Sequence, residues 1–94
     1  MTVGLCLVEM HLAGCHSLKE KRRVLRHLKD RLRSKFNLSV AELEHQDLWQ
    51  RATLGVVSIA ASREPVESCF QQVRAILEAE VPGEIASFHL EYLS

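Results

Sequence analysis

Apolar residues along the chain follow two different periods. Some segments show the alternation or the short apolar runs that are typical of β-strands, and others show apolar positions three and four apart, which is typical of one-sided helices. The predicted strands are residues 3–12, 38–44, 48–61 and 84–93. The predicted helices are residues 18–35 and 63–80. The third strand is apolar on both faces from Leu54 onward, so we expect it in the centre of a sheet.

The helix boundaries carry recognisable signals. Ser17 and Glu20 form an S-x-x-E capping box, and Ser62 precedes a first turn that contains Pro65. Asn37 is a plausible stop for the first helix. The resulting order, β-α-β-β-α-β, predicts an α+β ferredoxin-like fold, with a four-stranded antiparallel sheet and two helices on one face. We expect residues 1–94 to form one such domain.

The composition excludes several classes of protein. Of the 94 residues 47% are apolar and 26% are charged, which is typical of a globular chain and not of a disordered one. The longest apolar runs are far shorter than the roughly 20 residues that a membrane span needs. No signal peptide is recognisable, and three unpaired cysteines argue against a disulfide framework or a thiolate metal cage. The sequence predicts a cytoplasmic protein with no membrane partner and no cofactor.

The zero net charge conceals a strong asymmetry. Residues 18–35 hold nine of the twelve Lys and Arg residues and two acids, a local balance of +7, and the rest of the chain has a balance of −7. Five of these cations lie within an arc of about 80° on one flank of the first helix and form a line ~21 Å long. They are Lys19, Arg22, Arg26, Lys29 and Arg33.

Two interpretations of this cationic line remain open. The line can contact nucleic-acid phosphates, in which case RNA is the expected partner. Alternatively, its cations pair with acids of neighbouring elements, such as Glu64, Glu67 and Glu78, or with acids of another subunit.

The loop before the first helix is a weaker candidate. Backbone N–H groups at the helix start, with Lys21 nearby, are suited to a phosphate, although the capping box already satisfies some of them. Cys15 and His16 are adjacent, but neighbouring residues rarely orient toward one another as a nucleophile and base. We therefore assign no catalytic residue here.

Two polar groups are weak candidates for metal binding. Residues 44–47 offer three ligand types in a turn, but without a recognisable metal-ligand spacing, and His45 and Asp47 are more typical of a hairpin turn. Trp49, which follows the turn, is expected to anchor a hydrophobic contact in the core or between subunits. The second group lies on the open sheet face and depends on how the first and last strands pair. Its members are Glu9, His11, His89 and Glu91. We assign no metal site to either group.

The same open face is expected to be partly apolar. Val3, Leu5, Leu7 and Ile85 are placed on it by the alternation, so we expect a partner or a second copy of the chain to cover it. Cys6 and Cys69 are expected to pack in the core.

Several expected features of known activities are missing. The first strand has no aromatic residue for stacking on RNA bases, and the third has only Trp49 at its start. No two glycines have the G-x-x-G spacing of a KH-type clamp. The loop 13–17 has no arginine of the kind that acylphosphatases of this size and element order use to hold phosphate. An enzymatic function is therefore the less favoured class.

Two stretches carry a family resemblance. Residues 17–25 (SLKEKRRVL) and residues 40–52, from Val-Ala-Glu to Asp-Leu-Trp-Gln-Arg-Ala, resemble the YlxP-like family of small bacterial proteins, domain of unknown function 503. The resemblance covers essentially the whole chain. It implies a ferredoxin-like fold, a bacterial cytoplasmic location, and genes that often lie near translation-initiation and ribosome-maturation genes. It implies no catalytic residues.

The sequence therefore predicts a non-enzymatic accessory protein that contacts RNA or a ribosomal subunit through its basic first helix. The alternative is a homo-oligomeric interaction module whose basic helix pairs with acids of a neighbouring subunit.

Overall fold

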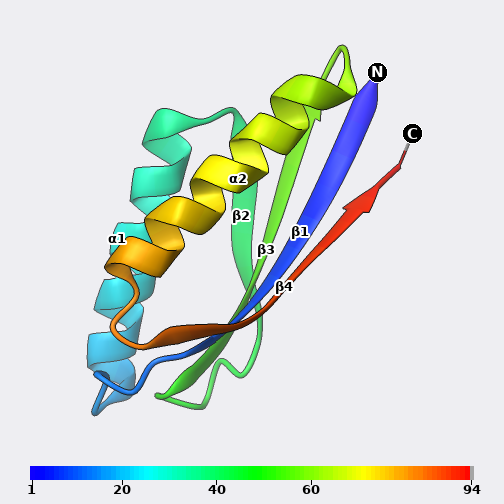
Figure 1. The fold of residues 1–94 in the computed structure, drawn as a ribbon. Coiled ribbons are helices and arrows are strands. Elements are labelled where there is room, and N and C mark those ends of the chain that lie inside the picture. The colour runs from blue at the N-terminus through cyan, green and yellow to red at the C-terminus, as the bar shows by residue number, and fades with distance from the viewer. Residues whose placement is uncertain (94) are drawn as a thin grey trace.

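The computed structural model describes residues 1–93 and confirms the predicted order of elements. The elements are β1 (Thr2–His11), α1 (Leu18–Lys35), β2 (Leu38–Glu44), β3 (Arg51–Ala60), α2 (Arg63–Glu80) and β4 (Glu84–Tyr92). The strands form one antiparallel sheet in the order β2-β3-β1-β4, and both helices cover the same face of it (Figure 1). This is the predicted α+β ferredoxin-like fold.

The core lies between the sheet and the two helices. Alternate residues of β1 and β3 point toward the helices and are buried, as the period of two predicts. α2 packs so closely on β1 that a Cβ atom at Gly4 would lie 2.5 Å from Val66 Cγ1. The core includes Cys6 and Cys69, as expected.

The two helix starts differ in how they are capped. At α1 the Ser17 hydroxyl accepts a hydrogen bond from the Glu20 backbone N–H, and the Glu20 carboxylate accepts one from the N–H of His16. The Ser17 half of the predicted capping box is therefore present, but the Glu20 carboxylate binds the N–H of His16, one residue before the N-cap, and not that of Ser17. Ser62 occupies the N-cap position of α2, but its side chain makes no capping hydrogen bond. Neither helix combines the length and the apolar character that crossing a membrane requires.

Two sequence-based predictions about the strands were wrong in detail. β3 begins at Arg51, and residues 45–50 form the β2–β3 loop, so Trp49 lies in this loop with half of its surface exposed and does not anchor the core. In β4 a bulge opposite Glu9 and Met10 shifts the register, which places Ile85 opposite Met10 on the helix-covered face. The expected place of Ile85 on the open face is therefore incorrect.

Candidate nucleic-acid interface

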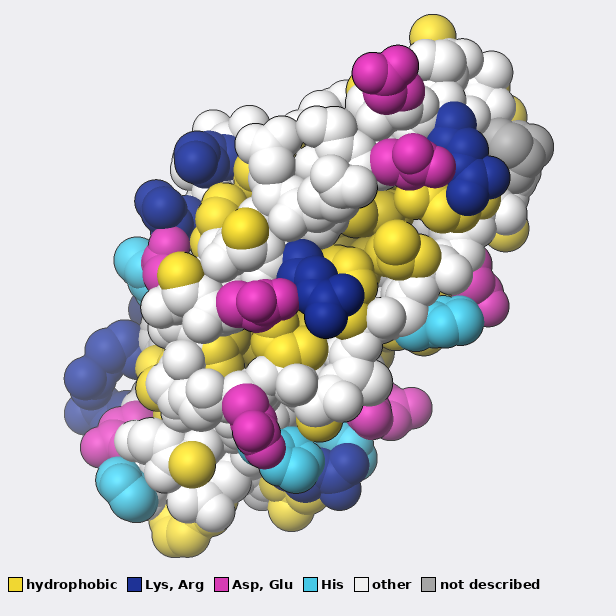
Figure 2. Space-filling model, viewed as in Figure 1, with side chains coloured by type: hydrophobic (Ala, Val, Ile, Leu, Met, Phe, Trp, Pro, Cys, Tyr) yellow, Lys and Arg dark blue, Asp and Glu magenta, His cyan; other side chains and the backbone are white. Residues whose placement is uncertain are grey.

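Four of the five cations of the predicted line lie on the flank of α1 that faces the edge strand β2, and the fifth, Lys19, is exposed nearer the start of the helix and does not line the groove described here. The side chains of Arg22, Arg26 and Lys29 line a groove of about 350 Å³ together with Arg33, and Leu25 and Glu42 complete its walls. We call this surface the basic groove. Arg33 also donates a hydrogen bond of 3.1 Å to the carbonyl oxygen of Val40 in β2, which fixes one end of the groove. Figure 2 shows Lys and Arg side chains along the α1 side of the molecule.

Most of these cations have no partner within the chain. Over residues 1–93 no carboxylate lies within ion-pair distance of Lys19, Arg22, Arg26 or Lys29, and Arg33 reaches only Asp30, at 3.7 Å. Two of the acids expected to neutralise the line are engaged within α2 instead. Glu67 pairs with Arg63, and Glu78 pairs with Arg74. Glu67 and Glu78 therefore form no ion pair with the cationic line within the chain.

The opposite flank of α1 faces α2 and is neutralised. His27 and Arg31 both contact the carboxylate of Glu80, the last residue of α2. Desolvation alone would raise the pKa of Glu80, but the hydrogen bonds from His27 and Arg31 outweigh it and hold this pKa below its ordinary value of 4.5. Arg31 is therefore paired on this flank, whereas Arg23 and Lys35, which lie outside the basic groove, have no carboxylate partner in residues 1–93.

Lys21 belongs to neither flank, because its side chain is buried with 1% of its surface exposed. Its Nζ donates hydrogen bonds of 2.6 Å to the carbonyl oxygens of His45 and Leu48 in the β2–β3 loop. It also lies 2.8 Å from the Glu42 carboxylate, an ion pair whose angles are not those of a hydrogen bond. Lys21 is therefore unable to hold a phosphate, contrary to what its place near the helix start suggested.

The sequence did contain a signal for this burial. Lys21 continues the apolar repeat of α1, since it lies three residues after Leu18 and four before Leu25. A lysine in such a stripe is buried only if its ammonium group finds partners, and the β2–β3 loop supplies them.

The loop before α1 has few free donors for an anion. The backbone N–H groups of Gly14 and Cys15 bind the carbonyl oxygens of Pro82 and Leu12, and the N–H of His16 binds Glu20. Cys15 is buried, and burial is the main cause that raises the pKa of its thiol. Both facts disfavour a phosphate site and a thiolate nucleophile at this loop.

The polar residues of the open sheet face form two histidine–glutamate pairs. β1 and β4 pair as expected, but His11 lies beside Glu84 at 3.8 Å, and His89 lies beside Glu91 at 3.3 Å. Glu9 joins neither pair, so the four residues considered from the sequence do not form one cluster.

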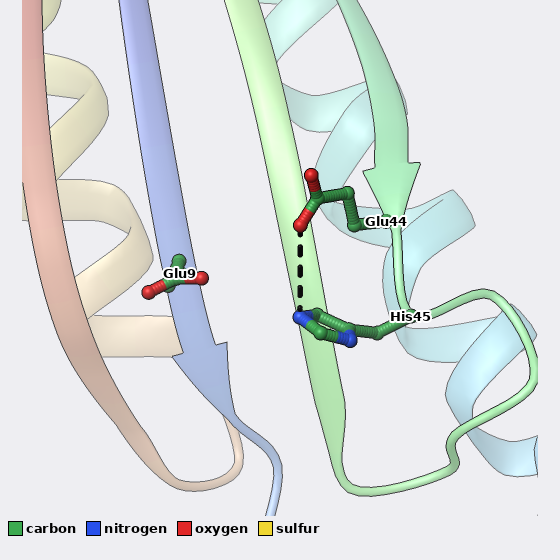
Figure 3. A group of neighbouring side chains, drawn as sticks. All are labelled: Glu9, Glu44 and His45. Atoms are coloured by element: carbon green, nitrogen blue, oxygen red, sulfur yellow. Dashed lines mark ion pairs between the residues drawn. The ribbon is translucent and has the colours of Figure 1, made fainter.

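Glu9 is instead close to Glu44 and His45, which come from the end of β2 and the start of the following loop. Their ligand atoms all lie within 4.8 Å of one another (Figure 3). In the sequence analysis Glu44 and His45 belonged to one candidate group and Glu9 to the other. The proximity of these three residues could not be predicted from the sequence, because it depends on β3 lying between β1 and β2.

The other end of the open face is apolar. Val3, Leu5 and Leu7 of β1 are half-buried, whereas Val57 and Ile59 of β3 are 41% and 50% exposed. These residues form an apolar surface without a covering element in residues 1–93, which we call the apolar patch.

Comparisons with known proteins place the chain in a family and confirm its fold. A family model described as "Protein of unknown function (DUF503)" matches residues 3–90. The uncharacterized protein YlxP of Bacillus subtilis (strain 168) is 36% identical over 77 residues, which cover 82% of this chain and 84% of YlxP.

Two solved structures of designed proteins share the fold. The de novo designed protein LFR1 1 with ferredoxin fold has a TM-score of 0.57 at 11% identity, covering 98% of this chain and 82% of its own. The designed protein Ferredog-Diesel has a TM-score of 0.53 at 15% identity, and the match covers 97% of this chain and 84% of the designed chain. At such low identity these two matches bear on the fold alone, whereas the family model spans nearly all of the sequence. The chain belongs to the DUF503, or YlxP-like, family.

Proposed function

We propose that this chain is a cytoplasmic, non-enzymatic accessory protein that contacts structured RNA or a ribosomal particle through the basic groove of α1. The observation that carries the proposal is the row of unpaired cations. Lys19, Arg22, Arg26 and Lys29 have no carboxylate partner within residues 1–93, although ten acids are present outside α1.

The energetics favour an external anion. Like charges three and four residues apart on a helix repel by a few tenths of a kcal/mol per pair, and an anion along the groove removes this cost. Phosphate contacts by such cations release counterions and give binding that weakens with salt. The fold has no stacking aromatics on its central strands, so the expected contact is with the phosphate backbone and is independent of sequence.

The test is binding of purified protein to ribosomal subunits and to bulk RNA across a salt series. The double variant Arg22→Glu/Arg26→Glu should bind more weakly, and the slope of log affinity against log salt should fall by about two, because each phosphate contact contributes about 0.9. The matched control is Arg23→Glu/Lys35→Glu, which changes the net charge equally at two exposed cations of α1 outside the groove.

The control should retain most of the affinity and the wild-type slope. Equal losses in both double variants would indicate a general charge effect, and an unchanged affinity in the groove variant would refute the proposal.

A second candidate function is a homo-oligomeric interaction module. The observation that favours it is the exposed apolar patch, in which Val57 and Ile59 remain 41% and 50% exposed. In such an assembly the basic groove would meet acids of the next subunit, since the chain outside residues 18–35 carries a balance of −7. Light scattering tests it. A stable multimer that Leu7→Glu dissociates supports this candidate, and a monomer at high concentration removes it.

A further inference from the structure

Three potential metal ligands meet on the open face of the sheet. Glu9 lies in β1, Glu44 is the last residue of β2, and His45 is the first residue of the β2–β3 loop. One carboxylate oxygen from each glutamate and one imidazole nitrogen all lie within 4.8 Å of one another. Figure 3 shows that the side chains of Glu44 and His45 extend across β3 toward β1.

A fourth polar group lies beneath them. Thr53 of β3 is the cross-strand partner of Glu9 on one side and of Glu44 on the other. Because directly opposed residues in a sheet point to the same face, its side chain stands between the two glutamates. Thr53 is 7% exposed, and its hydroxyl oxygen is buried with no hydrogen-bond partner in residues 1–93. Buried polar groups are almost always satisfied, so this hydroxyl is available to a group bound between the two glutamates.

Two hydrogen bonds to its carbonyl oxygen hold the backbone of His45 in place. His45 has a φ of 66°, a left-handed conformation that is uncommon outside glycine. Its carbonyl oxygen accepts hydrogen bonds from Lys21 Nζ at 2.6 Å and from the Leu48 N–H at 3.0 Å. The buried Lys21 thus acts as a positioning residue, because it fixes the backbone from which the imidazole reaches the two carboxylates.

The charges of the cluster call for a cation. Two carboxylates lie side by side, and over residues 1–93 no Lys or Arg forms an ion pair with either of them. Their neighbours are the His45 ring, 3.9 Å from Glu44, and the Ser87 hydroxyl, which donates to Glu9 at 3.3 Å. A divalent ion would neutralise both carboxylates and also bind the Thr53 oxygen.

We propose that Glu9, Glu44, His45 and the Thr53 hydroxyl form a binding site for a divalent transition-metal ion of the zinc class. The imidazole nitrogen favours zinc and its neighbours over magnesium and calcium, which take oxygen ligands. In a tetrahedral site with bonds of about 2.1 Å the ligand atoms lie about 3.4 Å from one another, so the side chains must close by up to about 1.4 Å. The site lies on the face opposite to the helices and is independent of the basic groove.

The experiment measures zinc binding to tag-free, chelator-treated protein by calorimetry, with the fluorescence of the single tryptophan, Trp49, as a second readout of the β2–β3 loop. We expect one zinc ion per chain. Glu9→Gln and His45→Asn should each weaken binding at least about tenfold. Asparagine is chosen at position 45 because it tolerates a positive φ. The control is His89→Asn, which removes an exposed histidine on the same face and should leave the affinity unchanged.

Thr53→Val tests the buried hydroxyl separately. Without metal this variant should melt at or above the wild-type temperature, because it removes an unsatisfied buried group. With saturating zinc it should show a smaller rise in melting temperature than the wild type. If zinc raises the melting temperature of Thr53→Val as much as that of the wild type, the four-ligand site is wrong.

Two further outcomes would overturn the proposal. One is the absence of saturable zinc binding below about 100 µM, and the other is equal binding by wild type, Glu9→Gln and His45→Asn. If the wild-type protein binds no zinc and Thr53→Val only raises its stability, the cluster is a group of polar side chains on the sheet face, and no metal site exists.

Discussion

The ammonium group of Lys21 donates a 2.6 Å hydrogen bond to the carbonyl oxygen of His45, and this contact joins α1 to the β2–β3 loop. Lys21 is 1% exposed, so the charge is stable in the interior only because two carbonyl oxygens and one carboxylate surround it.

Lys21→Met should therefore lower the free energy of unfolding by about 3–5 kcal/mol, because the Glu42 carboxylate and two carbonyl groups lose their buried partner. Urea denaturation followed by circular dichroism measures this change. Lys29→Met is the control, since Lys29 has no ion pair or hydrogen bond in residues 1–93, and it should alter stability by less than about 0.5 kcal/mol. A loss below about 1 kcal/mol for Lys21→Met would contradict this account.

Arg26 and Arg31 offer a matched comparison on one helix. Arg26→Gln should lower RNA affinity and reduce the salt slope by about 0.9, because Arg26 lines the basic groove without a partner. Arg31→Gln should leave the slope unchanged and cost at most about 1 kcal/mol of stability, because Arg31 is paired with Glu80 on the other flank. The salt series described above measures both slopes. Equal reductions in the two variants would show that the groove is not the contact surface.

The pairing of Glu80 predicts a component of acid sensitivity. Its pKa is lower in the folded protein than its ordinary value of 4.5, so the unfolded chain binds the proton more readily. The stabilisation is complete above pH 4.5 and is lost as the pH falls through the lower folded pKa. Glu80→Gln should flatten this part of the stability profile below pH 4.5, as measured by urea midpoints at several pH values. If the stability of Glu80→Gln falls below pH 4.5 as steeply as that of the wild type, this role for Glu80 is wrong.

Gly4 and Gly55 should differ in their tolerance of a methyl group. A Cβ at Gly4 would lie 2.5 Å from Val66 and 2.7 Å from Phe70, both fully buried, so Gly4→Ala should destabilise the fold by about 1–3 kcal/mol. A Cβ at Gly55 would meet the end of the Leu43 side chain at 2.6 Å, but Leu43 is 47% exposed and can rotate away. Gly55→Ala should therefore cost less than about 1 kcal/mol in the same urea assay. The reverse order would contradict the packing described here.

The element order and the cationic line were accessible from the sequence because both depend on local periodicity. The apolar spacing and the capping box of Ser17 and Glu20 were sufficient to place α1, and the spacing of the cations on that helix set their common flank. The β4 bulge was not accessible, because no residue near Ile85 marks it, and the face of Ile85 follows from the bulge alone.

The remaining features depend on contacts between distant segments. The burial of Lys21 requires the β2–β3 loop to lie below α1, and the meeting of Glu9 with Glu44 requires β3 to lie between their strands. Thr53 is an ordinary strand residue in the sequence. Its unsatisfied hydroxyl becomes apparent only when both of its cross-strand partners are known.

The strand order β2-β3-β1-β4 has a consequence for biosynthesis. The first strand to be made, Thr2–His11, is a central one, and its two neighbours are made third and last. At a synthesis rate of about 5–20 residues per second, the roughly 40 residues between β1 and β3 take about 2–8 s. During that time an apolar strand has both hydrogen-bonding edges open, and one edge stays open until residues 84–92 have been made. Until its last strand has been made, the nascent chain therefore carries an apolar segment that is open to pairing with other chains.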